Sequence, residues 1–146
     1  WQRWKFKQDS KMSKQEVKDE SKQSEGDQTV KNKMKQKMFD NHQARMVASV
    51  DDATVLVTNP THVSIALRYE PDRDGAPVVL GKGVDLIALR MRERARSRGI
   101  PIVENRPLAR AILATVPEGH PIPCDMYEAV AGIIAHILRL KGELAS

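Results

Sequence analysis

Asn59 and Pro60 form the most reactive peptide bond in this sequence. An asparagine usually reacts when the backbone nitrogen of the next residue attacks its side-chain amide, but proline has no N–H for that attack. The reverse attack remains open, in which the Asn59 side-chain nitrogen adds to its own backbone carbonyl, expels the Pro60 nitrogen and leaves a C-terminal succinimide. The pair therefore makes a single self-cut chemically possible, and a chain whose only reaction is this cut is not an enzyme acting on other molecules.

The residues after Asn59 are candidates for assisting this reaction. An amide nitrogen is a poor nucleophile, so the turn must hold it in position and polarise the carbonyl that it attacks. Thr61 is a candidate donor to the developing oxyanion, through its hydroxyl or its backbone N–H, and His62 is a candidate for carrying the proton to the leaving nitrogen. Asn-Pro is also an ordinary way to open a turn, so a turn that stays intact remains the alternative.

Short strands flank the turn. Residues 53–58 are a β-branched run, and residues 62–69 alternate with period two, which is typical of strands. A helix is predicted between Asp85, which caps its start, and Gly99, which ends it. Asp125 is predicted to cap the start of the last helix. Two further strands are predicted at residues 77–80 and 100–103. A short helix is predicted to begin at Pro107, and the last helix is predicted to end near Gly142. This pattern predicts an α+β domain over residues 51–146, with a small, mostly four-stranded sheet surrounded by helices.

The first 50 residues form a basic arm. They contain 12 Lys and Arg against 7 Asp and Glu, whereas residues 51–146 contain 12 of each kind. Residues 8–28 are too polar to bury a core, and the stretch 24–27 predicts a break in a partly helical linker. From Val30 onward, apolar residues return at helical spacing and predict a basic amphipathic helix; they are Met34, Met38, Phe39, His42 and Met46. Such an arm suits an anionic surface, either a membrane or a nucleic acid.

The tetrapeptide Asn59-Pro60-Thr61-His62, with the strands around it, resembles the FlhB/YscU proteins, the substrate-specificity switches of the flagellar and type III secretion export apparatus. Supporting segments follow in order along nearly the whole chain, at residues 12–20, 81–83, 86–90, 107–111 and 127–131. The first and third of these look more flagellar than injectisome-like. Gln28 departs from the family, because many members have proline there.

The resemblance implies self-cleavage between Asn59 and Pro60, with both fragments held together by the sheet. It also implies a change in the class of exported protein, from early rod, hook or needle subunits to later filament or translocator proteins. In that family four membrane helices precede a cytoplasmic domain. The aromatic and basic segment 1–7 would then follow the last of them, at the cytoplasmic face of the bacterial inner membrane.

The resemblance also implies partners and a second site. The expected partners are other membrane and cytoplasmic components of the export apparatus, export substrates, a hook- or needle-length control protein, and the membrane surface near the basic arm. If the last helix packs on the third strand, a shallow apolar pocket forms, and by resemblance it receives a short hydrophobic signal from early substrates. Its candidate residues are Ala76, Pro77, Ala131 and Ile134. Simple core packing of these four residues is the alternative.

Other chemistry finds little support in the sequence. His62, His120, His136 and Cys124 lack zinc-ligand spacing, so we expect no metal and no cofactor. The single cysteine fits a reducing compartment. Gly81-Lys82-Gly83 lacks the spacing of a phosphate loop and predicts a turn. The five arginines of residues 90–98 alternate and spread around their helix, so we expect no nucleic-acid binding.

Three competing functions remain open at this stage. The first is the injectisome counterpart of the flagellar protein. The second is an adaptor domain of a membrane complex whose Asn59-Pro60 turn stays intact. The third is a nucleic-acid-binding protein that uses the basic arm, which predicts steeply salt-dependent binding.

Overall fold

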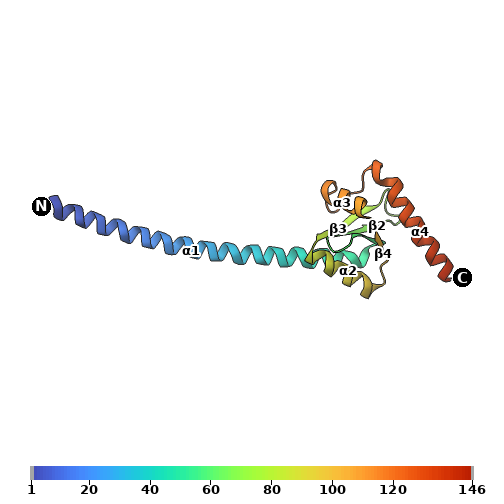
Figure 1. Cartoon of the computed structure of the whole chain (residues 1–146), viewed down its shortest axis with the longest axis horizontal. Helices are drawn as coiled ribbons and strands as arrows, with labels where there is room; N and C mark the ends of the chain where they lie inside the picture. Colours follow the sequence, from blue (N-terminus) through green and yellow to red (C-terminus); the bar gives the residue numbers. More distant parts are fainter. Residues whose placement is uncertain (1, 146) are drawn as a thin grey trace. The chain divides into compact units, whose positions relative to one another are not determined.

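A computed structural model describes the backbone from Gln2 to Ala145 and the side chains of residues 22–142. The side chains of the expected interfacial segment 1–7 lie outside these described residues. Figure 1 shows the order of the elements, which are α1 (Gln2–Ser49), η1 (Val50–Asp52), β1 (Val55–Asn59), β2 (Val63–Arg68), β3 (Val78–Val84), α2 (Leu86–Arg98), β4 (Ile102–Glu104), α3 (Arg106–Thr115), η2 (Cys124–Met126) and α4 (Tyr127–Ala145). The chain divides into two compact units, up to Asn41 and from His42 onward.

The first unit is one uninterrupted stretch of α1, so the predicted break at residues 24–27 is wrong. A single glycine costs a helix about 1 kcal/mol, and here Gly26 lies among Lys, Gln and Glu residues that favour helix. The Thr29 hydroxyl donates to the Glu25 carbonyl across the glycine at 2.9 Å, and the Gln28 amide donates to Asn32 at 3.1 Å. No described helix contains an apolar stretch long enough to cross a membrane.

The apolar residues of the predicted amphipathic helix differ in their exposure to solvent. Met34, Met38 and Phe39 are exposed in the first unit. Met46 belongs to the second unit and is buried against its sheet, as is Val50 of η1. The last turns of α1 are therefore part of the folded domain that carries the Asn-Pro turn.

The second unit is built on a mixed four-stranded sheet of order β3-β2-β1-β4, and the predicted α+β class and small sheet are confirmed. β1 pairs antiparallel with β2, from Val55 opposite Leu67 to Asn59 opposite Val63. On its other side β1 pairs parallel with β4. The strand that ends in Asn59 is therefore an inner strand, paired on both edges, and β4 is an edge strand. Pro101, which has no N–H to donate to a ladder, is compatible with this edge position.

Helices cover both faces of this sheet (Figure 1). On one face, α3 and α4 pack against alternate residues of the strands, in a core that includes Val55, Val57, Ile65, Ile112 and Ile134. On the other face, α2 and the end of α1 enclose Met46, Val50, Leu56, Ala66 and Met91. Because both faces are buried, β1 is apolar at successive positions and does not alternate.

β3 is longer than predicted, because Gly81, Lys82 and Gly83 continue the strand and do not form a turn. Both glycines are needed where helices press closely on the sheet. A Cβ on Gly81 would collide with the Ser49 side chain, and one on Gly83 would lie 2.6 Å from Ile87 Cγ2. The strand signal is therefore weakened in the sequence by residues that tight packing requires.

The helix ends differ from the predictions in detail. Gly99 ends α2 in the left-handed conformation, as predicted, with φ 71°. Asp85 precedes α2, but its side chain makes no capping hydrogen bond. Asp125 lies in η2, one turn before α4, and α4 continues past Gly142 to Ala145. At α3, the Asn105 side chain accepts a hydrogen bond from the Leu108 N–H at 3.2 Å, which caps that helix.

Candidate functional site

Asn59 is the last residue of β1 and is only 3% exposed. Its backbone is fixed from both sides. On one side Asn59 pairs with Val63 of β2. On the other side the carbonyl of the preceding Thr58 accepts a hydrogen bond at 3.0 Å from the N–H of Asn105, which directly follows β4. An inner strand of this kind leaves the Asn59 backbone little freedom. The sheet thus positions the carbonyl that the proposed reaction attacks.

The side-chain nitrogen of Asn59 is buried and has no hydrogen-bond partner within the described protein. Leaving a buried donor unpaired costs about 1–3 kcal/mol, so this arrangement is unfavourable for an asparagine with a purely structural role. A paired amide nitrogen would be held by its acceptor, whereas the Asn59 Nδ2 atom is not held by any. The atom that the sequence chemistry assigns as the nucleophile is therefore free to move toward a neighbouring carbonyl.

The residues after Asn59 close a tight turn. The His62 backbone N–H donates to the Asn59 carbonyl oxygen at 3.0 Å, which polarises the carbonyl that the amide nitrogen would attack. The described backbone donor to this oxygen is the His62 N–H, and the proposed role of Thr61 as a further donor stays a prediction. Thr61 has a φ of 67°, a conformation that is a genuine outlier for a β-branched residue. The turn therefore holds strain immediately after the Asn59–Pro60 bond.

The His62 side chain lies on the surface of the turn, in contact with Asp85. Its Nδ1 atom is 3.7 Å from an Asp85 carboxylate oxygen, and both side chains are more than half exposed. The Asp85 N–H also donates to the His62 carbonyl at 3.0 Å. Asp85 has a positive φ of 51°, so two of the residues around this turn adopt strained backbone conformations. The contact between Asp85 and His62 could not be predicted from the sequence, in which the place of Asp85 before a helical pattern indicates a helix cap.

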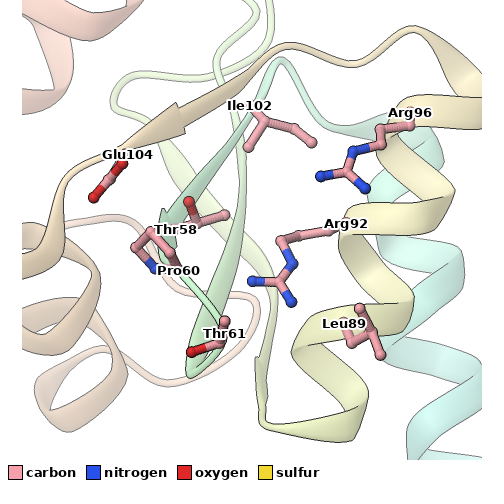
Figure 2. Close-up of a pocket in the computed structure, with 8 residues that line it drawn as sticks. All are labelled: Thr58, Pro60, Thr61, Leu89, Arg92, Arg96, Ile102 and Glu104. Carbon is pink, nitrogen blue, oxygen red and sulfur yellow. The ribbon is translucent and has the colours of Figure 1, made fainter.

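A charged pocket opens beside the turn, as Figure 2 shows. It has a volume of about 390 Å³ and is lined by Thr58, Pro60, Thr61, Leu89, Arg92, Arg96, Ile102 and Glu104. Pro60 is half-buried and Thr61 is exposed. The turn thus forms one wall of a solvent-accessible hollow, while Asn59 itself lies behind that wall in the sheet.

The other predicted site residues gather in a second, separate pocket. Ala76 and Pro77 come from the segment before β3, and Ala131 and Ile134 come from α4. The four line an apolar pocket of about 280 Å³, together with Tyr69, Gly75, Tyr127, Ala135 and Leu138. The structure therefore brings these four residues together as the predicted packing of α4 requires.

The two ion pairs with perturbed pKa values lie outside the turn. The Arg68 guanidinium donates to both oxygens of Asp74, at 3.0 and 3.1 Å, and lowers the pKa of that buried carboxyl. The Arg94 guanidinium lowers the pKa of Asp51 in the same way. These pairs tie loop to strand and α2 to η1, so we assign them to the stability of the fold.

A comparison with known protein families matches residues 1–137 of the chain to the family described as the FlhB HrpN YscU SpaS family. The chain belongs to this family. The resemblance inferred from the Asn59–His62 segment is thereby confirmed, and this FlhB/YscU-family chain is related to components of both flagellar and type III secretion export systems.

Individual relatives cover most of this chain. It is 41% identical over 141 residues to the flagellar biosynthetic protein FlhB of Bacillus subtilis, which covers 97% of the chain and 39% of that protein. It is 44% identical over 139 residues to the hypersensitivity response secretion protein HrcU of Ralstonia nicotianae, covering 93% and 38%. The chain thus spans about two fifths of the length of these curated relatives.

The fold is also similar to a solved structure of a relative. The crystal structure of the cytoplasmic domain of FlhB from Shewanella putrefaciens superimposes with a TM-score of 0.67 and 41% sequence identity. The match covers 70% of this chain and 79% of that one. The architecture of the FlhB/YscU-family chain is therefore that of a cytoplasmic domain of the family.

Proposed function

We propose that this chain is the cytoplasmic switch domain of a flagellar-type protein-export apparatus, and that it cuts its own backbone between Asn59 and Pro60. The observation that carries the proposal is the buried, unpaired Asn59 amide nitrogen at the start of a strained Asn-Pro turn. Membership in the family supports the export context. The reaction occurs once per chain, needs no cofactor, and releases no substrate.

The proposed reaction follows from the contacts of the turn. The Asn59 Nδ2 atom forms a bond to the Asn59 carbonyl carbon, and the carbonyl oxygen gains negative charge that the His62 N–H stabilises. The C–N bond to Pro60 then breaks, and the proton lost by Nδ2 passes to the proline nitrogen, directly or through His62. Residue 59 is left as a C-terminal succinimide, which water later opens.

The sheet keeps the two fragments together after the cut. Fragment 1–59 contributes β1, and fragment 60–146 contributes both of its neighbours, β2 and β4. Further contacts cross the cut, since the Thr54 N–H donates to the Leu67 carbonyl at 2.8 Å and the Tyr69 N–H donates to the Thr54 hydroxyl at 3.0 Å. We therefore expect a cut domain that stays folded, with new chain ends only at the turn.

The release of the turn is the proposed basis of the switch. Before the cut, Asn59 and His62 are joined through two strained or restricted residues, Pro60 and Thr61. After the cut, residues 60–62 become a free N-terminus that relaxes its backbone and changes the surface that the export apparatus and its length-control protein contact. The exported class then changes from early rod and hook proteins to late filament proteins, as in the flagellar branch of the family.

The first experiment compares freshly purified wild-type protein with Asn59→Ala by denaturing gel electrophoresis and intact mass spectrometry. Two fragments, 1–59 and 60–146, are expected from the wild type, and their initial masses sum to that of the uncut chain because cyclisation consumes no water. Asn59→Ala stays intact, and Asn41→Ala, an exposed asparagine of α1, serves as a control that still cuts. A wild-type chain that stays uncut would instead favour the adaptor function.

The apolar pocket is the proposed receptor for a hydrophobic segment of early export substrates. Its lining by Ala76, Pro77, Ala131 and Ile134 supports this, because small and apolar walls fit an extended apolar peptide. Ala131→Asp places a charge on the exposed rim of the pocket. We expect this charge to lower the affinity for an extended Val/Leu peptide on the order of tenfold, as measured by isothermal titration calorimetry. Ala129→Asp, on the same helix but outside the pocket, is the matched control; equal loss in both variants would refute the assignment.

A further inference from the structure

The five arginines of α2 do not all have the same environment. Arg94 forms a two-pronged pair with Asp51, in which two guanidinium nitrogens each lie 2.7 Å from a carboxylate oxygen. Arg98 reaches the same carboxylate at 3.4 Å. These two arginines are therefore committed to holding α2 against η1 within the fold.

Arg90 also has a partner, because its guanidinium lies 2.7 Å from the side-chain amide oxygen of Gln43 in the orientation that satisfies both groups. Arg92 and Arg96 differ from the other three. Neither guanidinium has an ion pair or hydrogen bond with any residue whose side chain the structure describes. Arg92 is nevertheless half-buried. Its side chain lies partly against the fold and lines the pocket beside the turn, so its cationic group is available to an anion that enters there.

The two unpartnered arginines line the same pocket, one turn apart on α2 (Figure 2). Figure 2 shows the Arg92 guanidinium pointing from the helix toward the Pro60–Thr61 turn, and Arg96 extending toward Ile102. Leu89 and Ile102 supply apolar walls, and Leu89 is 41% exposed. The pocket therefore combines two unsatisfied cations with an exposed apolar surface.

The floor of the pocket is the edge strand β4, which pairs only with β1. At the two ends of this pairing, the Pro101 carbonyl accepts from the Leu56 N–H and the Asn105 N–H donates to the Thr58 carbonyl, while Val103 pairs with Val57 between them. Because a strand's backbone groups alternate in direction, those of Ile102 and Glu104 point to the outer edge, where no described residue pairs with them. An open edge of this kind accepts the backbone of an extended peptide.

We propose that the pocket binds an extended peptide segment of a partner protein, which pairs with the β4 edge and places an acidic side chain on Arg92 and Arg96. Guanidinium groups bind carboxylates with two-pronged geometry, and Leu89 and Ile102 receive an apolar residue of the same segment. The Glu104 carboxylate at the rim disfavours a polyanion such as a nucleic acid, and residues 51–146 carry no net charge to attract one.

This site stands independently of self-cleavage. Apart from Thr58, its lining residues all belong to fragment 60–146, and they are present whether or not the chain cuts. Pro60 and Thr61 form one wall, however, so the state of the turn changes the shape of the site. The site is also distinct from the apolar pocket between α4 and the start of β3, with which it shares no residue.

The test uses the 146-residue chain carrying Asn59→Ala, so that the turn is uniform. The probe is the acetylated and amidated peptide Val-Asp-Val-Asp-Val, followed by two-dimensional amide NMR titration. We expect saturable shifts at Leu89, Arg92, Ile102 and Glu104. The Arg92→Ala/Arg96→Ala double variant should bind on the order of tenfold to a hundredfold more weakly. The control variant Arg98→Ala removes one positive charge from the same helix, outside the pocket, and should change affinity less than about twofold.

Further arms separate the possible sources of binding. Val-Asn-Val-Asn-Val tests the carboxylates, sodium acetate tests a free anion without a backbone, and a single-stranded RNA tests the polyanion. The proposal requires that the aspartate peptide binds and that the other three do not approach its affinity. It is overturned by the absence of shifts at the pocket, by equal weakening in the Arg98→Ala variant, or by RNA that competes at equal concentration.

Discussion

The strain at Thr61 makes the sharpest prediction for the cleavage reaction. Thr61 adopts a φ of 67°, which costs a residue with a side chain about 1–2 kcal/mol and costs glycine almost nothing. Cutting the Asn59–Pro60 bond frees the turn and releases this strain. In Thr61→Gly the strain is absent from the start, so the barrier should rise by about 1–2 kcal/mol and cleavage should slow about 5- to 30-fold.

The same substitution has an opposite effect on stability. Measured in the uncut Asn59→Ala background, Thr61→Gly gains the relieved 1–2 kcal/mol and loses about 0.5–1 kcal/mol to the greater entropy of the unfolded glycine chain. The net expectation is a domain that is more stable by up to about 1.5 kcal/mol and yet cuts more slowly. Denaturant unfolding reports the first quantity. The appearance of fragments on a denaturing gel, after pulse synthesis in a cell-free system, reports the second.

Thr61→Ala is the control that separates strain from the hydroxyl. Alanine keeps the positive φ unfavourable but removes the hydroxyl, and the Asn59 carbonyl oxygen already accepts from the His62 N–H. We therefore expect Thr61→Ala to cut at close to the wild-type rate. If Thr61→Ala and Thr61→Gly slow equally, the hydroxyl and not the strain assists the reaction. If Thr61→Gly cuts as fast as wild type, stored strain plays no part.

Two further predictions concern the fold that holds the site. The Lys82 ammonium donates to two carbonyls at the end of α3, each at 3.0 Å. Lys82→Met should therefore destabilise the uncut domain by about 1–2 kcal/mol, as measured by denaturant unfolding. An unchanged midpoint of that unfolding transition would refute a capping role for Lys82. Asp74 has its pKa lowered below 3.8 by Arg68, so its contribution is complete at neutral pH and is lost as pH falls through the lowered pKa. Asp74→Asn should thus be less stable than wild type at neutral pH, and the difference should shrink in acid; a constant difference across pH would contradict this linkage.

The sequence predicted the parts of the fold whose signals are local. The β-branched run before Asn59, the helix that ends at Gly99 and the helix that begins near Pro107 all occur where periodicity and turn residues placed them. The errors arose where packing decides the outcome. The glycines of β3 are dictated by neighbouring helices, and the long α1 continues across Gly26 because one glycine is too small a penalty to end it.

The candidate site divides in the same way. Asn59 could be proposed from bond chemistry, since only the identity of the next residue is needed to exclude the usual reaction, and the choice between cleavage and an intact turn came from the family resemblance. The Asp85 contact with His62 and the grouping of Arg92 with Ile102 depend on how α2 and β4 sit against the turn. Alternating arginines look alike in a sequence. Only their partners, or the lack of them, distinguish the two that line the pocket.

The inner position of β1 gives the cut domain an unusual mechanical property. In the uncut chain, a pull on α1 reaches the rest of the domain through covalent bonds. After the cut at Asn59, the same pull would be carried only by the non-covalent contacts of fragment 1–59. These are the pairing of β1 with β2 and β4, the packing of Met46 and Val50, and the ion pairs of Asp51 with Arg94 and Arg98. Self-cleavage would thus convert a covalent tether into a releasable one, whose breaking strength is set by these contacts together.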